Sequence, residues 1–207
     1  MRPISLLAKL FVVVISLTAP SAVFANTPEQ LYQTCIACHG EQGQGNSAVN
    51  APAIAGQHAW YTTRQLQNFI SGVRGAHEKD VLGKQMKAMT SQLEPNKDVP
   101  VLADYIATLP GKVAKQEISG DLMNGSRYYQ AKCGACHGGK AEGNKSFHAP
   151  RLAGQDVSYL QRQMKNFVEG VRGSHAEDKL GKQMAMMAKI VSDKELSDII
   201  FYISQQQ

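Results

Sequence analysis

Long apolar segments are scarce in this chain of 207 residues. The apolar run at 10–17 covers eight positions, whereas a helix needs roughly 20 to span a bilayer. The positive charges of Arg2 and Lys9 precede this run, and small residues lead from it to Ala25. An uncleaved anchor would need a longer run, so residues 1–25 are typical of a secretory signal peptide. We therefore expect cleavage after Ala25 and export of a soluble protein.

Concentrated basic charge is also missing. Aromatic residues make up 7% of the chain, and the formal net charge is +5. Nucleic-acid binding usually leaves a cluster of lysine and arginine with aromatic residues between them. The sequence contains no such cluster, and we expect no nucleic-acid partner.

Cysteine is rare, and its few positions carry the main signal. All four cysteines fall in two pentapeptides of the pattern Cys-x-x-Cys-His, at 35–39 and 133–137. Two thiols at this spacing can form thioethers to the two vinyl groups on one edge of a porphyrin, and the adjacent histidine then lies under the ring with a nitrogen aimed at iron. The motifs predict two covalently bound haem c groups. The predicted attachment residues are Cys35, Cys38, Cys133 and Cys136, with His39 and His137 as axial ligands to iron.

Two other uses of paired cysteines fit the sequence less well. A structural zinc site can combine two Cys-x-x-Cys pairs, but it does not require a histidine directly after each pair. A thioredoxin-like dithiol expects a βαβ setting, and no strand pattern surrounds either motif. Haem c is therefore favoured over zinc binding and over dithiol chemistry.

The chain contains the same unit twice. A shift of 98 residues superposes the two motifs without a gap, and it also pairs Ala-Gly-Gln at 55–57 with the same tripeptide at 153–155. The segments Gly-Val-Arg-Gly and Gly-Lys-Gln-Met repeat at the same offset. A period of this length indicates duplication of a whole domain. The expected domains are 26–110 and 120–207, joined by a linker at 111–119.

Periodicity and capping signals predict an all-α fold. In the first copy, Thr27, Pro28 and Gln30 form a capping-box start for a helix that leads into the first motif. Middle helices are expected at about 58–72 and 156–170, because their apolar residues recur at helical spacing.

The last helix of each copy also has a recognisable start. In the second copy, Ser192 and Glu195 make another capping box. In the first, Pro100 would cost about 3 kcal/mol inside a helix, so we expect that helix to begin near Asp98, with Pro100 in its first turn. The remaining stretches are expected to be irregular loops that wrap a macrocycle, at 40–57, 73–92, 138–155 and 171–190.

The second axial ligand decides what each iron can do. A methionine thioether closes the iron and favours electron transfer, whereas an open face permits ligand chemistry. The repeat leaves two methionine pairs, Met86 with Met184 or Met89 with Met187, while Met186 has no methionine counterpart. Met86 and Met184 both follow Gly-Lys-Gln ahead of the last helix. We favour these two as the distal ligands.

Histidine is the competing distal ligand. His77 and His175 match by the repeat and offer bis-histidine ligation, but both lie in polar segments where surface positions are expected. The carbonyl groups of Pro52 and Pro150, 13 residues after each proximal histidine, are placed to accept the proximal imidazole N–H. Candidate donors to the haem propionates are Trp60, Tyr61, Arg64, Tyr159 and Arg162, and no spacing rule selects among them.

The chain resembles the dihaem cytochromes c4 over residues 26–207. The resemblance rests on the paired motifs, on the Pro-x-(Ile/Leu)-Ala-Gly-Gln segments at 52–57 and 150–155, and on the positions of Met86 and Met184. It implies two small all-α cytochrome c domains, packed about a pseudo-twofold axis with their haem edges facing each other.

The resemblance also implies a function. Members of that family carry electrons in the bacterial periplasm toward terminal oxidases, often in loose association with the membrane. We therefore expect a non-catalytic carrier whose partners are redox proteins, namely respiratory donors and a terminal oxidase, with peripheral membrane association. The alternative is the cytochrome subunit of a sulfur-oxidising enzyme, such as flavocytochrome c sulfide dehydrogenase or a thiosulfate dehydrogenase. A dihaem peroxidase fits less well, because it needs an open iron face and both copies offer a methionine.

Overall fold

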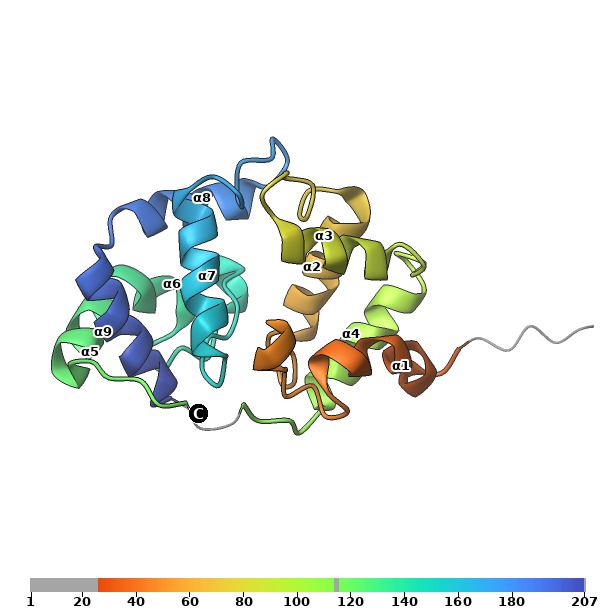
Figure 1. Ribbon diagram of the computed structural model, residues 1–207, viewed down its shortest axis with the longest axis horizontal. Coiled ribbons are helices and arrows are strands. Elements are labelled where there is room, and N and C mark those ends of the chain that lie inside the picture. Colours follow the sequence, from red (N-terminus) through yellow and green to blue (C-terminus); the bar gives the residue numbers. More distant parts are fainter. Residues whose placement is uncertain (1–25, 114–115, 207) are drawn as a thin grey trace, which may run out of the picture.

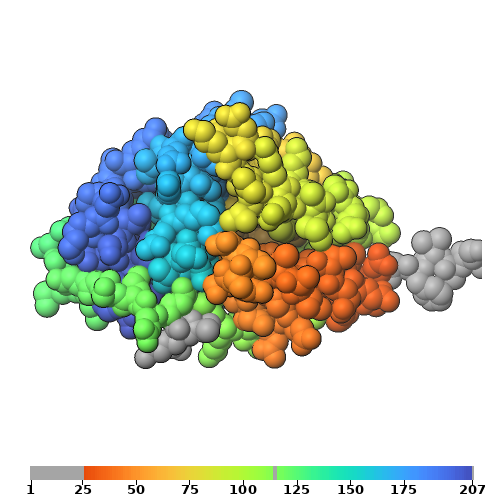
Figure 2. Space-filling model, viewed as in Figure 1, coloured from red at the N-terminus to blue at the C-terminus, as the bar shows by residue number. Residues whose placement is uncertain are grey.

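A computed structural model describes residues 26–113 and 116–206, so the expected signal peptide at 1–25 lies outside the described residues. Within these ranges the chain is helical, with two isolated β-bridges and no strand. Two helical halves lie side by side and meet along a broad contact (Figure 1, Figure 2). The all-α prediction is confirmed. In the same ranges, no helix is long and apolar enough to cross a membrane.

Each half is built from the same helices in the same order. The first half contains α1 (Pro28–His39), α2 (Ala59–Ser71), α3 (Val81–Thr90) and α4 (Asp98–Thr108). The second contains α5 (Leu122–Tyr129), a π-helical turn (Gln130–Gly134), α6 (Ala135–His137), α7 (Val157–Val168), α8 (Lys179–Lys189) and α9 (Asp193–Ser204). Short 3-10 turns lie at Ser47–Val49 and Lys145–Phe147.

The expected helix starts are confirmed. Thr27 and Ser192 each form a complete capping box, at the starts of α1 and α9. Such a cap is worth about 1 kcal/mol, because it satisfies N–H groups that have no partner inside the helix. Helix α4 begins at Asp98 and carries Pro100 in its first turn, where the missing proline N–H costs no helical hydrogen bond.

The prediction of irregular loops at 73–92 and 171–190 was wrong, because these stretches contain α3 and α8. Both helices are capped by aspartate. The carboxylates of Asp80 and Asp178 accept the N–H groups of Gly83 and Gly181, each at 2.9 Å. A β-carbon on either glycine would collide with the capping carboxylate, so glycine lets the cap form.

The glycines of the repeated Gly-Val-Arg-Gly segment belong to the same arrangement. Gly75 and Gly173 have φ values of 76° and 80°, a region that favours glycine. A β-carbon at Gly75 would also meet the carbonyl of Gly83, and the same holds for Gly173 and Gly181. This close approach holds the loop before each helix against its first turn.

The gap-free repeat fails in two places: upstream of the second motif, and before the last helix, where Tyr105 and Tyr202 are 97 residues apart and pack on Tyr32 and Tyr129. Tyr32 donates its hydroxyl hydrogen to the Gly40 carbonyl at 2.7 Å, and Tyr129 does the same to Gly138 at 2.7 Å. Tyr32 lies three residues before Cys35, whereas Tyr129 lies four residues before Cys133. The π-helical turn absorbs the extra residue, as such turns commonly do.

Each half has its own apolar core, formed where its first, middle and last helices meet. The first core is formed by Leu31, Tyr32, Leu66, Val99, Leu102 and Ile106. The second is formed by Tyr129, Ala141, Ala153, Val157, Leu160, Ile199, Ile200 and Ile203. Many of these residues are the apolar residues that recur at helical spacing in the sequence. They hold the Cys-x-x-Cys-His segments in place.

The second half has an ion pair that the first lacks. Lys132, directly before Cys133, contacts both carboxylate oxygens of Glu195 at 2.7 Å. In the first half Thr34 takes the place of Lys132, and Asp98 takes the place of Glu195. The bond from Lys132, followed by that from the Ser192 N–H, lowers the pKa of Glu195 to about 2.

This ion pair predicts an acid-dependent contribution to stability. Because the folded-state pKa lies below the unfolded value of about 4.3, the contribution is present above that value and is lost as pH falls toward 2. Glu195→Gln should lower the thermal midpoint of the haem-loaded protein by a few degrees at pH 7, and the difference from wild type should shrink below pH 4. Thermal unfolding followed by circular dichroism at several pH values measures this.

The control is Glu169→Gln, which removes an exposed pair with Lys165 at 3.7 Å. Exposed pairs contribute little, so this change should leave the midpoint nearly unchanged at every pH. An equal effect of both substitutions would contradict the role given to Glu195.

Candidate haem sites

A single cavity of about 620 Å³ runs between the two halves and is lined by both of them. All four cysteines and both histidines of the motifs line it. Its apolar walls come from the same helices in each half, as the repeat requires. They include Leu66, Phe69, Leu102 and Ile106 in the first half, and Leu160, Phe167, Ile200 and Ile203 in the second.

The two motif histidines have one ring nitrogen engaged and the other free for a metal. His39 and His137 are buried, and their Nδ1 atoms lie 2.8 and 2.9 Å from the carbonyl oxygens of Pro52 and Pro150. Burial lowers the pKa of both imidazoles, which favours the neutral ring. A neutral ring that donates from Nδ1 leaves the lone pair of Nε2 for iron. The expected contact with each proline carbonyl is therefore present.

The four thiols are free and occur as one partly buried and one exposed group in each motif. Burial raises the pKa of Cys35, and it raises that of Cys133 to about 11. Among the described residues, no three side chains of His, Cys, Asp or Glu converge into a metal site. The two cysteine pairs thus do not come together as the zinc alternative requires.

Both candidate methionine pairs reach the cavity. Met86 on α3 and Met184 on α8 are half-buried and line it. Met89 and Met187 also line it but are more exposed. Met186 is exposed and does not line the cavity.

The competing histidines are engaged elsewhere. His77 and His175 are absent from the cavity lining. Their Nδ1 atoms accept the backbone N–H groups of Lys79 and Glu177, each at 3.2 Å. These local bonds hold both rings in the polar segments that precede α3 and α8.

Two glutamines join the halves through reciprocal backbone bonds. The side-chain amide of Gln57 donates to the Arg151 carbonyl at 3.0 Å and accepts its N–H at 3.2 Å. Gln155 makes the same pair of bonds with Ala53, at 2.8 and 3.1 Å. Ala53 and Arg151 are themselves related by the 98-residue repeat. The bonds therefore obey the pseudo-twofold relation between the halves.

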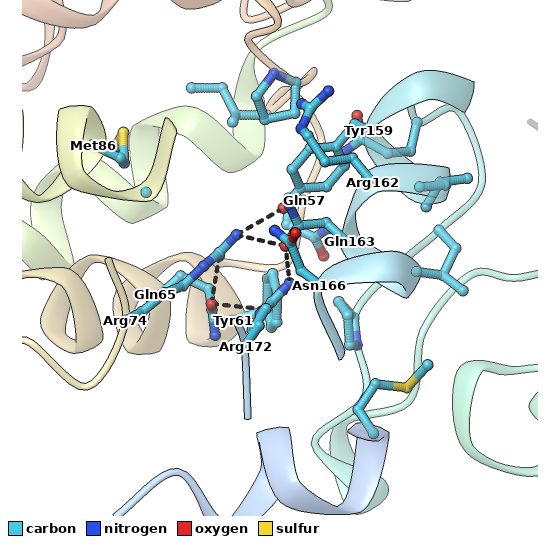
Figure 3. A pocket seen from close by; sticks show the side chains of 18 of the residues that line it. Gln57, Tyr61, Gln65, Arg74, Met86, Tyr159, Arg162, Gln163, Asn166 and Arg172 are labelled. Atoms are coloured by element: carbon cyan, nitrogen blue, oxygen red, sulfur yellow. Dashed lines mark hydrogen bonds between the residues drawn. The ribbon is translucent and has the colours of Figure 1, made fainter. Parts of the chain in front are cut away.

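Two arginines extend this symmetry at the centre of the contact (Figure 3). Arg74 donates to Gln65, to Tyr159 and to Gln163 at 2.8, 3.2 and 3.1 Å. Its repeat partner Arg172 donates to Gln163, to Tyr61 and to Gln65 at 2.8, 3.3 and 3.1 Å. Each arginine thus reaches from its own half into the other.

A second pair of arginines lies beside this centre. Arg64 donates to the His148 carbonyl at 2.8 Å, and Arg162 donates to the Asn50 carbonyl at 2.9 Å. Both arginines line the cavity. Trp60, another candidate from the sequence, stacks on His58 instead and is absent from the lining.

The cavity is rich in positive charge and fits an anionic ligand. Among the described residues, none of these four guanidiniums forms an ion pair with a carboxylate. The buried Nε atoms of Arg74 and Arg162 have no hydrogen-bond partner. Burial would raise the pKa of Tyr159, but Arg74 and Arg172 outweigh it and lower that pKa. A porphyrin that bears propionates would cover the apolar walls and place negative charge beside these arginines.

The sequence contains a signal for Gln57, Arg74 and their repeat counterparts, none of which was predicted to have a role. Gln57, Arg74 and their partners lie in the repeated Ala-Gly-Gln and Gly-Val-Arg-Gly segments. Polar side chains kept at matching places in both copies are consistent with a contact between the copies.

Comparisons with known proteins agree with this geometry. The Cytochrome c family model matches residues 27–110 and again residues 122–207. Cytochrome c4 from Azotobacter vinelandii is 31% identical over 179 residues, which cover 82% of each chain. The chain belongs to the cytochrome c4 family.

Other relatives extend the comparison. A crystal structure of reduced recombinant cytochrome c4 from Pseudomonas stutzeri superposes with a TM-score of 0.69 at 27% identity, and the match covers 87% of this chain and 97% of that one. The "thiosulfate dehydrogenase electron acceptor" of Thiomonas intermedia (strain K12) is 30% identical over 199 residues, or 91% of this chain and 84% of that protein. As a member of the cytochrome c4 family, the chain is a dihaem electron-transfer cytochrome with two covalent haem c groups.

The glutamine bonds predict how firmly the halves of this cytochrome c4 are joined. Gln57→Ala removes the two hydrogen bonds that join the halves and a third to the His58 N–H. At about 1 kcal/mol each, we expect a loss of about 2–3 kcal/mol in the free energy of unfolding. Gln155→Ala should cost a similar amount. Urea unfolding of the haem-loaded protein measures both, with the exposed Gln33→Ala as a control that stays within about 0.5 kcal/mol of wild type. Equal midpoints for all three variants would contradict the prediction.

Proposed function

We propose that this cytochrome is an exported, non-catalytic carrier that passes single electrons between respiratory donors and a terminal oxidase. The observation that carries the proposal is the shared cavity, which places a histidine and a methionine from each half around one continuous space. Residues 1–25 are the signal peptide for export to the periplasm, where residues 26–110 and 120–207 form the haem domains joined by 111–119. Loose attachment to the membrane surface is part of this proposal.

The residues that hold each haem follow from the lining of the cavity. When bound, haem c supplies one-electron chemistry through its iron, which alternates between the ferrous and ferric states. In the first half, Cys35 and Cys38 form the thioethers, while His39 offers Nε2 and Met86 its sulfur. In the second half the same roles fall to Cys133, Cys136, His137 and Met184. Closing both iron faces in this way favours electron transfer over catalysis.

The buried arginines hold the propionates in this proposal. Arg74 and Arg172 lie where both halves meet, and each guanidinium also stacks over a phenylalanine of its own half at 4.6 Å. Neither guanidinium forms an ion pair with a described carboxylate, so acidic groups stabilise the folded state when they enter the cavity. The contact between the halves therefore depends on haem.

A second candidate function rests on the relative from Thiomonas intermedia. That protein is named a thiosulfate dehydrogenase electron acceptor, and 91% of this chain aligns with it. In this alternative the chain accepts electrons from a sulfur-oxidising enzyme whose catalytic centre lies on another polypeptide. Rapid reduction by purified thiosulfate dehydrogenase and thiosulfate, with no reduction by quinol-oxidising membranes, would favour it over the respiratory role.

Replacing the proposed distal ligands tests the site assignment. Met86→His should lower one of the two reduction potentials, because imidazole favours the ferric state more than a thioether does. A shift of at least ~0.1 V lies within the roughly 0.8 V range that axial ligands control. Met184→His should lower the other potential in the same way. Spectroelectrochemical titration of protein shown by intact mass to carry two haems provides the measurement.

The matched control is Met89→Leu, which keeps the apolar volume and should leave both potentials nearly in place. If Met89→Leu removes thioether ligation while Met86→Leu spares it, the ligand lies one helical turn further along α3. Loss of a ligand in His77→Ala would instead reject methionine ligation altogether.

Removing a buried guanidinium tests the propionate proposal. Arg74→Gln should lower at least one reduction potential by on the order of 50 mV, since a nearby buried positive charge favours the ferrous state. Arg127→Gln removes the same charge from an exposed position on α5 and should leave the potentials unchanged. Redox titration of both variants compares them. Equal potentials in the two variants would contradict a role for Arg74 beside haem.

A further inference from the structure

One end of helix α8 exposes an unusual group of large apolar side chains. Met186, Met187 and Ile190 are 64%, 37% and 57% exposed. Ile190 lies four residues after Met186 and three after Met187, so the three side chains are neighbours on the surface. We call this group, together with Lys182 and Lys189, the α8 face.

The first half does not share this surface. The repeat places Ala88, Met89 and Gln92 at the three apolar positions. Two of the three large apolar groups are thus replaced by a methyl group and an amide. Folding requirements common to both copies do not explain the difference, since α3 and α8 have the same caps and the same place in each half. A function confined to the second half does explain it.

The α8 face lies against the second haem site. Met187 is exposed and also lines the cavity, and Met184, the proposed iron ligand, lies one turn before it on the same helix. This end of α8 therefore forms the wall between solvent and the second haem. A protein that exchanges electrons there needs to contact this wall closely.

The charged residues around the α8 face indicate what kind of partner surface can bind there. Lys179, Lys182 and Lys189 lie on α8, which contains no aspartate or glutamate. Of the acidic residues nearby, Asp178 caps the helix and Glu195 is paired with Lys132. Glu177 and Asp193 are exposed just outside the two ends of α8, so the basic charge borders the face at Lys182 and Lys189. An apolar centre with a basic rim complements an apolar patch bordered by carboxylates.

We propose that the α8 face is the docking surface through which the second half exchanges electrons with an acidic redox protein. The inference rests on the proposed carrier function and adds to it the side of the molecule that the partner occupies. The lysines steer the partner and accelerate encounter. The methionines, whose flexible side chains adapt to varied surfaces, contribute the apolar contact.

Stopped-flow oxidation of the reduced dihaem protein tests the proposal. The probe is an oxidised blue-copper protein whose copper face carries an apolar patch bordered by carboxylates. The double variant Met186→Ala/Ile190→Gln gives α8 the residues of the first half, and its second-order rate should fall at least fivefold. Lys182→Gln/Lys189→Gln should slow the reaction at low ionic strength and converge with wild type at high salt, because salt screens steering.

Two controls separate docking from damage. Val101→Ala removes an exposed apolar group on α4, in the other half, and should leave the rate unchanged. Ferricyanide, a small oxidant that needs no docking surface, should oxidise the Met186→Ala/Ile190→Gln variant as fast as wild type. Unchanged reduction potentials in this variant confirm that the haem sites are intact.

The outcomes separate this inference from the carrier function. If the copper protein oxidises Met186→Ala/Ile190→Gln as fast as wild type, the docking proposal is wrong and the carrier function stands. If neither the copper protein nor ferricyanide oxidises wild type, the docking proposal and the carrier function are both wrong. If that variant instead loses only its binding to phosphatidylglycerol vesicles, or only self-association in sedimentation, the face contacts lipid or a second copy and the proposal is overturned.

Discussion

Buried positive charge is the constraint on which the contact between the two halves depends. Arg74 and Arg172 cross from one half to the other and bond to tyrosine and glutamine, but no described carboxylate pairs with them. A buried guanidinium without a counter-charge is costly, and the cavity beside it is lined by apolar groups. The haems of a cytochrome c4 supply what both features require, so cofactor, interface and fold form one system.

Because the chain is a duplication, a few types of residue are enough to form the contact between the halves. Each bond made by Gln57, Arg64 or Arg74 across the contact has a counterpart made by Gln155, Arg162 or Arg172. A twofold contact uses the same patch twice, so one favourable pair of segments yields two sets of bonds. One departure from symmetry lies at this contact, where His58, whose counterpart is Asp156, places its Nε2 atom 2.8 Å from the Glu142 carbonyl. Others lie at the π-helical turn, at the Lys132–Glu195 pair and at the surface of α8. Those are the places where the two haem domains are free to differ.

Local signals in the sequence predicted most of the helices but missed α3 and α8. Capping boxes and the position of Pro100 located the starts of α1, α4 and α9, because caps depend on residues only three apart. Helices α3 and α8 escaped detection, since their aspartate caps and interior glycines resemble loop composition. The extra residue before Cys133 was also hidden, because a one-residue shift outside the motif is visible only when Tyr129 is seen to repeat the bond made by Tyr32.

The sequence by itself determined the cofactor and the duplication, and it predicted the proximal histidines, because Cys-x-x-Cys-His chemistry depends on neighbours within five residues. Only the tertiary structure decided which polar residues join the halves and which methionines reach the cavity. These contacts join residues about 100 positions apart in the sequence, such as Gln57 and Arg151. No local sequence pattern predicts contacts between residues so far apart. They follow from how two domains pack, which is decided by shape and buried charge together.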